Sequence, residues 1–129
     1  MADTPRSLRV LVVEDERLIR WSIAETLGHA GHVVMEADDG ASAIRALTNP
    51  AAPVDAVVLD YRLPDSNDLA LLADIRRLSP RSAVILMTAH GTPEVTRGAL
   101  DLGVYQVINK PFEMHDLQSL LLKACARHR

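Results

Sequence analysis

Hydrophobic and polar positions along this chain form short apolar runs separated by longer amphipathic segments. Five apolar runs, rich in valine, isoleucine and leucine, predict buried strands over residues 8–13, 32–37, 55–60, 83–88 and 105–109. Apolar residues at helical spacing predict helices over residues 16–30, 41–47, 69–78, 92–102 and 114–126. The pattern therefore predicts five units, each a strand followed by a helix.

Residues that start or end helices support these boundaries. Gly31 follows the first helix, and glycine readily adopts the left-handed conformation that ends many helices. Thr92, Pro93 and Glu94 place a capping hydroxyl, a proline and an acid at the start of the fourth helix. That helix also contains Gly98, which costs about 1 kcal/mol relative to alanine. We therefore expect the fourth helix to be the least stable and most mobile of the five.

Continuous apolar strands that alternate with helices are typical of a parallel sheet covered on both faces. Because crossovers between parallel strands are right-handed, helices lie on both sides of such a sheet. The prediction is an α/β fold with a doubly wound, five-stranded parallel sheet, formed by one domain over residues 8–127. Residues 1–7 are mostly polar, and we expect them to be disordered.

Composition narrows the class of protein. The chain has 129 residues, of which 48% are hydrophobic and 24% charged, which suits one domain with a buried core. Its net charge of −3 argues against direct nucleic-acid binding, which needs a basic excess. The lone Cys125 excludes a disulfide framework and a cysteine-based zinc site within the chain. No apolar run approaches the ~20 residues of a membrane span, and no signal peptide is evident, so we expect a cytoplasmic protein.

The predicted strands end in residues that carry chemistry. These are Glu14, Asp15 and Glu16 after the first strand, Asp60 in the third, Thr88 and Ala89 at the fourth, and Lys110 and Pro111 after the fifth. Taken alone, each has an ordinary structural explanation, because acids suit helix starts and turns and lysine is usually solvated. Ligands of such sheets bind beyond the carboxyl ends of the strands, where these groups are expected to converge.

The predicted acidic cluster needs a cation, because converging carboxylates repel one another and protonating one at neutral pH is costly. Oxygen ligands of this kind suit Mg²⁺, which often pairs with a phosphate. Glu14, Asp15 and Asp60 carry three formal negative charges, which Mg²⁺ and Lys110 together offset. A carboxylate in such surroundings is able to act as a nucleophile in phosphoryl transfer, with the cations stabilising the transferred group.

Four segments at these strand ends resemble the receiver domains of bacterial two-component response regulators. They are VVEDE (12–16), VVLDYRLPD (57–65), ILMTAHG (85–91) and NKPF (109–112), in the order and at the spacing of that family. The resemblance covers about residues 8–127 and implies the (βα)5 flavodoxin-like receiver fold. MTAHGTPE and EDERLIRWS are most similar to receivers of the nitrogen-regulator class, which precede an ATPase and DNA-binding module in activators of the alternative sigma factor. No ATPase motif is present, so this is either a stand-alone receiver or a fragment of a longer regulator.

The resemblance implies a role for each residue of the cluster. Asp60 is the expected phosphoacceptor. The expected magnesium ligands are Asp15, Asp60, the backbone carbonyl of Arg62 and, through a bound water, Glu14. Lys110 is expected to pair with the phosphoryl group and Thr88 to hydrogen-bond it after transfer. The bond before Pro111 is expected to be cis, a conformation found almost only before proline.

The implied function is a phosphorylation-dependent signalling receiver rather than a classical enzyme. A sensor histidine kinase donates the phosphoryl group, and the domain catalyses the transfer to Asp60 and a slow autodephosphorylation. The modified site then favours one of two conformations of the fourth helix and fifth strand. Residues 92–127 are the expected surface for a homodimer or for an output domain that regulates transcription. We expect Trp21 to serve packing or a partner rather than chemistry.

Two positions depart from the pattern of the family. Three residues before Lys110, where receivers usually carry an aromatic ring that reports phosphorylation, this chain has Val107. Tyr105 lies two residues earlier, and the alternation of a strand predicts that it shares a face with Val107. Asp68 stands where the family usually has glycine. Aspartate tolerates left-handed conformations better than most residues, so we expect this loop to form with some strain or with different contacts.

Three residues beside the cluster are candidates for tuning the lifetime of the acyl phosphate. Arg62 and His90 lie two residues after Asp60 and Thr88, and Ala89 leaves room for the phosphoryl group. Arg62 is expected either to hold the phosphate or to cover the site, and His90 either to orient water or to be inert. The other histidines, at positions 29, 32, 115 and 128, lack metal-ligand spacing and are expected on the surface.

Three other functions share parts of this pattern. A haloacid-dehalogenase-type phosphatase also uses an aspartate with Mg²⁺, but its general acid would stand at Arg62, which cannot donate in that way. A flavodoxin-type nucleotide or flavin module needs a phosphate cradle rich in glycine or hydroxyls, where this chain has acids. The third alternative is a receiver-like interaction module that is regulated without phosphorylation, and Val107 leaves this alternative open.

Overall fold

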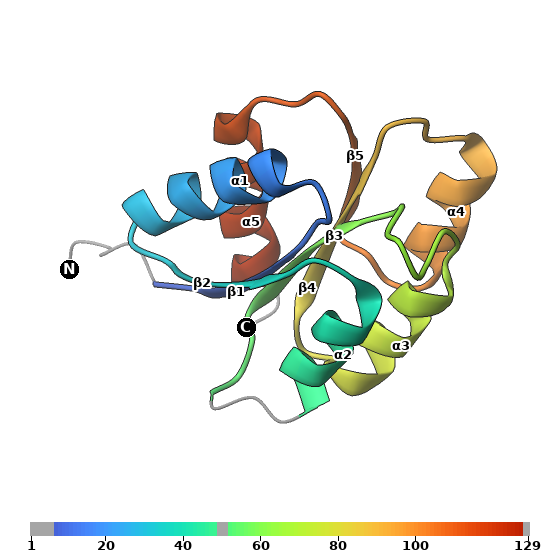
Figure 1. The fold of residues 1–129 in the computed structure, drawn as a ribbon, viewed down its shortest axis with the longest axis horizontal. Helices are drawn as coiled ribbons and strands as arrows, with labels where there is room; N and C mark the ends of the chain where they lie inside the picture. Colours follow the sequence, from blue (N-terminus) through green and yellow to red (C-terminus); the bar gives the residue numbers. More distant parts are fainter. Residues whose placement is uncertain (1–6, 49–51, 128–129) are drawn as a thin grey trace.

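Five parallel strands form one sheet in the computed structural model, which describes residues 7–48 and 52–127 (Figure 1). The strands are β1 (Arg9–Val13), β2 (Val33–Ala37), β3 (Ala56–Asp60), β4 (Ala83–Thr88) and β5 (Gln106–Asn109). Their order across the sheet is β2-β1-β3-β4-β5, so the direction of winding reverses after β2. The predicted doubly wound, five-stranded parallel sheet is confirmed. Of the segment predicted to be disordered, residues 1–6 lie outside the described residues.

Helices cover both faces of the sheet. They are α1 (Arg17–His29), α2 (Gly40–Thr48), α3 (Ala70–Leu78), α4 (Pro93–Asp101) and α5 (Met114–Arg127). In Figure 1, α1 and α5 lie on one side of the strands, and α2, α3 and α4 lie on the other. Every strand and helix ends within one residue of its predicted position.

The strands of the sheet divide the core into two apolar layers. In β1, Leu11 and Val13 pack toward α2, α3 and α4, whereas Val10 and Val12 pack toward α1 and α5. Every residue of β3 and β4 is buried, because both strands lie inside the sheet and are covered on both faces. This double burial explains why their sequences are continuously apolar rather than alternating.

Gly98 of α4 has a packing role that its helix propensity does not reveal. A Cβ atom at this position would lie 2.7 Å from Cδ1 of Leu69, which precedes α3. Glycine therefore allows α4 to approach the start of α3 closely. The predicted end of α1 is also confirmed, because Gly31 has a φ of +96°.

His32 corrects one prediction about the surface. Its side chain is buried just before β2, where Nδ1 accepts a hydrogen bond of 3.1 Å from the backbone N–H of Leu8. His29 and His115 are exposed as predicted, and position 128 lies outside the described residues. His32 was misplaced because a single histidine beside an apolar strand has no periodic signal of burial.

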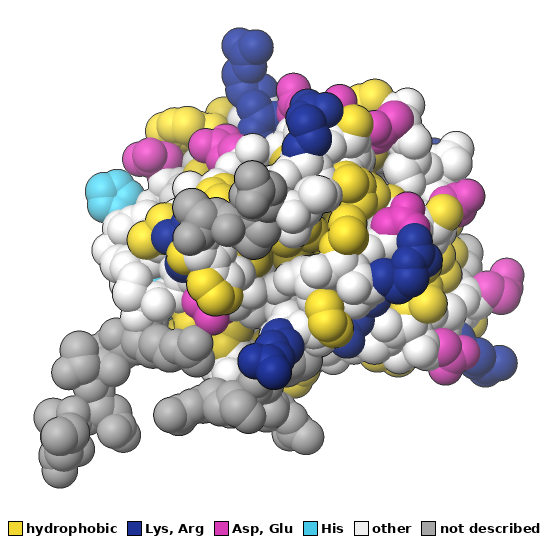
Figure 2. All heavy atoms as spheres, turned by 90° about the horizontal axis from the view of Figure 1, so that it is seen from below, with side chains coloured by type: hydrophobic (Ala, Val, Ile, Leu, Met, Phe, Trp, Pro, Cys, Tyr) yellow, Lys and Arg dark blue, Asp and Glu magenta, His cyan; other side chains and the backbone are white. Residues whose placement is uncertain are grey.

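The surface is mixed in charge. Figure 2 shows basic and acidic side chains scattered among apolar ones on the face seen from below, which agrees with the small net charge of −3. Among the described residues, no helix is both long enough and apolar enough to span a bilayer.

Candidate functional site

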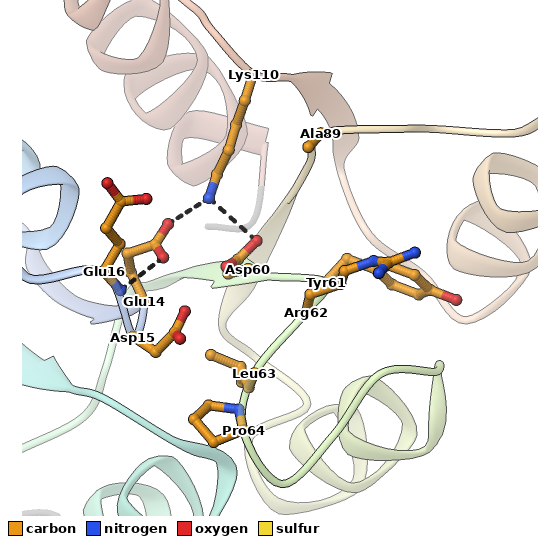
Figure 3. A pocket seen from close by; sticks show the side chains of 10 residues that line it. All are labelled: Glu14, Asp15, Glu16, Asp60, Tyr61, Arg62, Leu63, Pro64, Ala89 and Lys110. Atoms are coloured by element: carbon orange, nitrogen blue, oxygen red, sulfur yellow. Dashed lines mark hydrogen bonds and ion pairs between the residues drawn. The ribbon is translucent and has the colours of Figure 1, made fainter.

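The carboxyl ends of the strands lie together along one side of the sheet, which we call its carboxyl edge. This edge brings together side chains that are far apart in sequence (Figure 3). Glu14 follows β1, and its N–H donates to the carbonyl of Ala37 at 3.0 Å. Asp60 is the last residue of β3. Lys110 follows β5, and its N–H donates to the carbonyl of Thr88 at 2.9 Å. Such backbone bonds extend the sheet by one residue and fix the points from which Glu14 and Lys110 project.

Lys110 connects two buried carboxylates. Its Nζ lies 2.5 Å from Oε1 of Glu14 and 3.3 Å from Oδ1 of Asp60. Glu14 is 1% exposed and Asp60 is 6% exposed, whereas Asp15 is exposed. One carboxylate oxygen from each of these three acids lies within 4.8 Å of the other two. The predicted convergence of the strand ends is therefore confirmed for these four residues.

Burial and mutual repulsion perturb the charges of this cluster. Burial, followed by the neighbouring Glu14 carboxylate, raises the pKa of Asp60 to about 6, although Lys110 opposes this effect. Burial alone would lower the pKa of Lys110, but its bonds to Glu14 and Asp60 outweigh that effect and raise it. At neutral pH the lysine is cationic, and the two buried acids share its charge. Additional positive charge would therefore stabilise the ionised cluster.

The donor set fits a hard divalent cation. Carboxylate oxygens are the ligands that Mg²⁺ prefers, and its retained waters need space beside them. The cluster opens into a pocket of about 300 Å³ that is also lined by Arg62, Leu63 and Ala89. Figure 3 shows the Arg62 side chain pointing away from the acids, whereas the carboxylates of Glu14 and Asp60 lie beside the amine of Lys110. The direct and water-mediated ligand roles, including that of the Arg62 carbonyl, stay predictions.

Thr88 and His90 lie beside the pocket rather than among the residues that line it. Thr88 is 2% exposed, and its hydroxyl accepts a hydrogen bond of 3.2 Å from the backbone N–H of His90. The His90 side chain is exposed. Ala89, between them, does line the pocket. The Lys110–Pro111 peptide bond is cis, as the resemblance implied.

Tyr105 and Val107 do not share a face, which corrects the prediction from strand alternation. Val107 packs against the layer under α2, α3 and α4, whereas Tyr105 packs against the layer under α1 and α5. The reason is that β5 begins only at Gln106, so Tyr105 lies in the preceding bend and outside the alternating backbone. The ring of Tyr105 therefore lies in a different layer from Val107, and a switch role for Tyr105 stays a prediction.

Asp68 adopts neither a left-handed nor a strained backbone. Among the described residues, only glycines have positive φ. Its Oδ1 instead accepts a hydrogen bond of 2.9 Å from the N–H of Ala70, the first residue of α3. An aspartate in this position satisfies one of the free N–H groups at a helix start, which explains how the loop forms without glycine.

Two residues that support the site were missed by the analysis of the sequence. Arg20 of α1 donates through Nη1 to the carbonyl of Glu14 at 2.9 Å and through Nε to Glu36 at 3.0 Å. Asp65 accepts hydrogen bonds from the first two N–H groups of α2. Neither contact has a local signal, although a basic residue in the helix that follows an acidic strand end is a hint for Arg20.

These features define a class: a doubly wound domain with a buried aspartate, neighbouring acids and a lysine at the carboxyl edge of its sheet. A model of the response regulator receiver domain matches residues 10–122. The chain therefore belongs to the response regulator receiver domain family, which acts in two-component systems.

Relatives refine this assignment. The DNA-binding transcriptional regulator NtrC of Escherichia coli K12 is 31% identical over 93% of this chain and 25% of its own length. A putative NtrX-like response regulator of Rickettsia conorii is 38% identical over 92% of this chain and 25% of its own length. The resemblance to the nitrogen-regulator class is thereby confirmed. The chain spans about a quarter of the length of these relatives.

Solved structures agree with both the fold and the class. A CheY-like receiver domain from Methanospirillum hungatei has a TM-score of 0.89 at 24% identity, covering 95% of this chain and 97% of that one, which shows the fold. The beryllofluoride-activated NtrC4 receiver domain dimer has a TM-score of 0.85 at 29% identity, covering 94% of this chain and 98% of that one.

Proposed function

We propose that this receiver domain accepts a phosphoryl group on Asp60, with Mg²⁺ bound at the acidic cluster, and that a sensor histidine kinase donates it. The observation that carries the proposal is the placement of Asp60. Its carboxylate is buried within 3.3 Å of the Lys110 amine and within 4.8 Å of two further carboxylates, and it faces an open pocket. Asp60 is thus both screened from bulk water and reachable by a phosphoryl donor.

The transfer is a simple displacement. A carboxylate oxygen of Asp60 attacks phosphorus, the P–O bond forms, and the P–N bond to the donor imidazole breaks. The leaving imidazole nitrogen keeps the electron pair of that bond and takes up a proton. Asp15, Asp60, the Arg62 carbonyl and, through a water, Glu14 would hold Mg²⁺, which would supply positive charge to the transferred oxygens.

The residues around Asp60 have complementary tasks. Lys110 already holds Glu14 and Asp60 together and pairs with the negative oxygens of the phosphoryl group once they arrive. The hydroxyl of Thr88 accepts a bond from His90 and keeps its proton free to donate to the phosphoryl group. Ala89 leaves the pocket open above the site. Hydrolysis of the acyl phosphate by water then returns the domain to its starting state.

Apolar surface beside the site favours a protein donor. On α1, Leu18 is 68% exposed and Trp21 is 56% exposed. Nearby, Ile19 of α1, Phe112 in the segment before α5 and Met114 at the start of α5 line an apolar hollow that also touches Lys110. Exposed apolar groups of this size commonly mark protein contacts. They support docking of the kinase over α1, with its phosphohistidine directed into the pocket.

The position of Thr88 suggests how phosphorylation of Asp60 changes the surface that contacts a partner. It ends β4, next to β5 and before α4, so a shift of its hydroxyl toward the phosphoryl group moves the start of the loop to α4. We infer that the face of residues 92–127 then contacts a second copy or an output domain that regulates transcription. The related NtrC4 receiver is a dimer when activated by beryllofluoride, which supports a second copy of this domain as the partner. Because Val107 has no aromatic ring to rotate, we expect the conformational change of β5 and α4 to be smaller than in receivers that carry a ring at this position.

Intact mass after incubation with acetyl phosphate and Mg²⁺ tests the chemistry. We expect an increase by one phosphoryl group, absent in Asp60→Asn and absent when the cation is chelated. The matched control is Asp68→Asn, which changes an acid of the same loop outside the cluster and leaves the adduct intact. No adduct on the unaltered chain, together with no binding of beryllium fluoride, would favour the interaction module regulated without phosphorylation.

A further inference from the structure

We propose that Asp65 is a positioning residue for the divalent cation. It attaches the segment that follows Asp60 to the start of α2 and thereby sets the affinity of the acidic cluster for Mg²⁺. This inference rests on the function proposed above. It concerns a side chain outside the cluster, which acts through the backbone of residues 61–65.

Both carboxylate oxygens of Asp65 are engaged by α2. Oδ1 accepts a hydrogen bond of 2.8 Å from the N–H of Gly40, and Oδ2 accepts one of 3.0 Å from the N–H of Ala41. The N–H groups of the first helical turn have no partner within the helix, and the positive end of the helix dipole favours a carboxylate there. The contact therefore joins two segments that are 25 residues apart in sequence.

The segment between Asp60 and Asp65 has little freedom once both ends are held. At its start, the N–H of Tyr61 donates to the carbonyl of Met87 in β4 at 2.8 Å. Near its end, Leu63 and Ser66 exchange two backbone hydrogen bonds of 2.7 and 3.2 Å, and the side chain of Leu63 is buried. Arg62, whose carbonyl is the expected metal ligand, lies between these anchors.

A glycine in α2 is matched to this contact. A Cβ atom on Gly40 would lie 3.1 Å from Oδ1 of Asp65 and 3.1 Å from Cδ2 of Leu71. The absence of a side chain thus lets the N–H of α2 approach the carboxylate directly. A methyl group there would force the Asp65 carboxylate or the Leu71 side chain to move by a few tenths of an ångström. The hydrogen bond between Gly40 and Asp65 therefore depends on glycine at position 40.

The chain contains a matched control in Asp39. Its Oδ1 accepts a hydrogen bond of 2.7 Å from the N–H of Ser42, so it caps the same helix with the same chemical group. Asp39 precedes α2 in the chain, however, and its contact does not tie the helix to the loop after Asp60. Loss of either aspartate removes a cap from α2, but only loss of Asp65 releases the loop.

Urea unfolding at increasing MgCl₂ separates the two effects. Because a ligand that binds only the folded state stabilises it by mass action, the Mg²⁺ dependence of the unfolding free energy gives the dissociation constant. For Asp65→Ala we expect Mg²⁺ binding about tenfold weaker, the size typical of outer partners of metal ligands. Asp39→Ala is expected to lose comparable stability without metal and to bind Mg²⁺ within about twofold of the unaltered chain.

Gly40→Ala supplies a second route to the same state, should Asp65→Ala fold poorly. It is expected to weaken Mg²⁺ binding, and Gly40→Ala combined with Asp65→Asn should weaken it no further than the stronger single change, because both act on one contact. Unchanged Mg²⁺ affinity in the Asp65 variants, or equal weakening by Asp39→Ala, would overturn the positioning role and leave the proposed function standing. No Mg²⁺ stabilisation of the unaltered chain would overturn both.

Discussion

The strands begin at one side of the sheet, the amino edge, and end at the other, the carboxyl edge. Both of these edges bury polar side chains, but the side chains have different partners. At the amino edge, His32 precedes β2 and Ser82 precedes β4, with exposures of 9% and 0%. At the carboxyl edge, Glu14 and Asp60 are exposed by only 1% and 6%. Burial alone therefore does not distinguish the functional edge from the structural one.

The partners of these groups make the distinction. At the amino edge each side chain bonds to backbone: His32 accepts from Leu8 N–H at 3.1 Å, and Ser82 donates to the carbonyl of Val54 at 2.6 Å. At the carboxyl edge Glu14 and Asp60 face each other across Lys110. Neutral groups that bond to the backbone stabilise the scaffold. Two negative carboxylates that repel one another need a cation, and they are available for chemistry.

Removal of Lys110 is expected to have the largest effect on stability. Lys110→Met leaves two buried carboxylates without their cation, and breaking such a buried pair typically costs about 3 kcal/mol. We expect this loss in urea unfolding with chelator at neutral pH, and partial recovery on adding Mg²⁺, because a divalent cation restores positive charge to the cluster.

Two variants control this prediction. Lys123→Met removes an exposed lysine of α5 and is expected to change stability by no more than about 0.5 kcal/mol. Asp60→Asn combined with Lys110→Met removes one of the two opposing charges and should recover much of the loss. If Lys110→Met proved as stable as Lys123→Met, the carboxyl edge would not depend on its cation, and the contrast between the two edges would fail.

The amino edge is expected to respond more weakly and without effect on chemistry. Ser82→Ala removes the hydroxyl that donates to Val54 and lies 2.5 Å from the hydroxyl of Ser79. An unsatisfied buried carbonyl costs about 1–2 kcal/mol, which urea unfolding measures directly. The Mg²⁺ affinity and the yield of phosphoryl adduct should be unchanged. A large fall in either would show that the amino edge is coupled to the site.

Much of this molecule was predictable because its signals are local. The apolar runs of β3 and β4 fix buried strands, and the parallel arrangement brings their ends to one edge whatever the loop details. Glu14, Asp60 and Lys110 were therefore placed together from sequence alone. Their residue types then limited the site to a hard cation and phosphoryl chemistry.

The missed features depend on contacts across the fold. Asp65 reaches α2 only because Gly40 leaves room for it, and Gly98 matters through Leu69 rather than through helix propensity. The alternation rule places Tyr105 on the wrong face because this residue lies in the bend before β5, where side chains do not alternate as they do within a strand. Tertiary distances and strand ends of this kind are not encoded in any short sequence pattern.

The smallest expected effect concerns how the stability of the fold depends on pH, because His32 at the amino edge and Asp60 at the carboxyl edge contribute with opposite sign. Burial lowers the pKa of His32 below its ordinary 6.5, so the folded state favours the neutral ring that accepts from Leu8 N–H. Its contribution is complete above pH 6.5 and is lost as the pH falls below that value. Asp60 has the opposite sign, because its raised pKa of about 6 means that acidification from pH 6 toward 4 stabilises the fold.

Unfolding free energies at pH 5 and pH 7 with chelator separate these contributions. In an Asp60→Asn background, where the carboxylate of Asp60 is absent, His32→Gln is expected to reduce the loss of stability on acidification, because glutamine does not titrate. The matched control His29→Gln changes an exposed ring and should leave the pH dependence as it was. If the unfolding free energy changed equally between pH 5 and pH 7 in the two histidine variants, the amino edge would tolerate a charged His32 ring. Burial would then not restrict ionisation at the amino edge, and the contrast between the two edges would be weaker than their hydrogen-bond partners indicate.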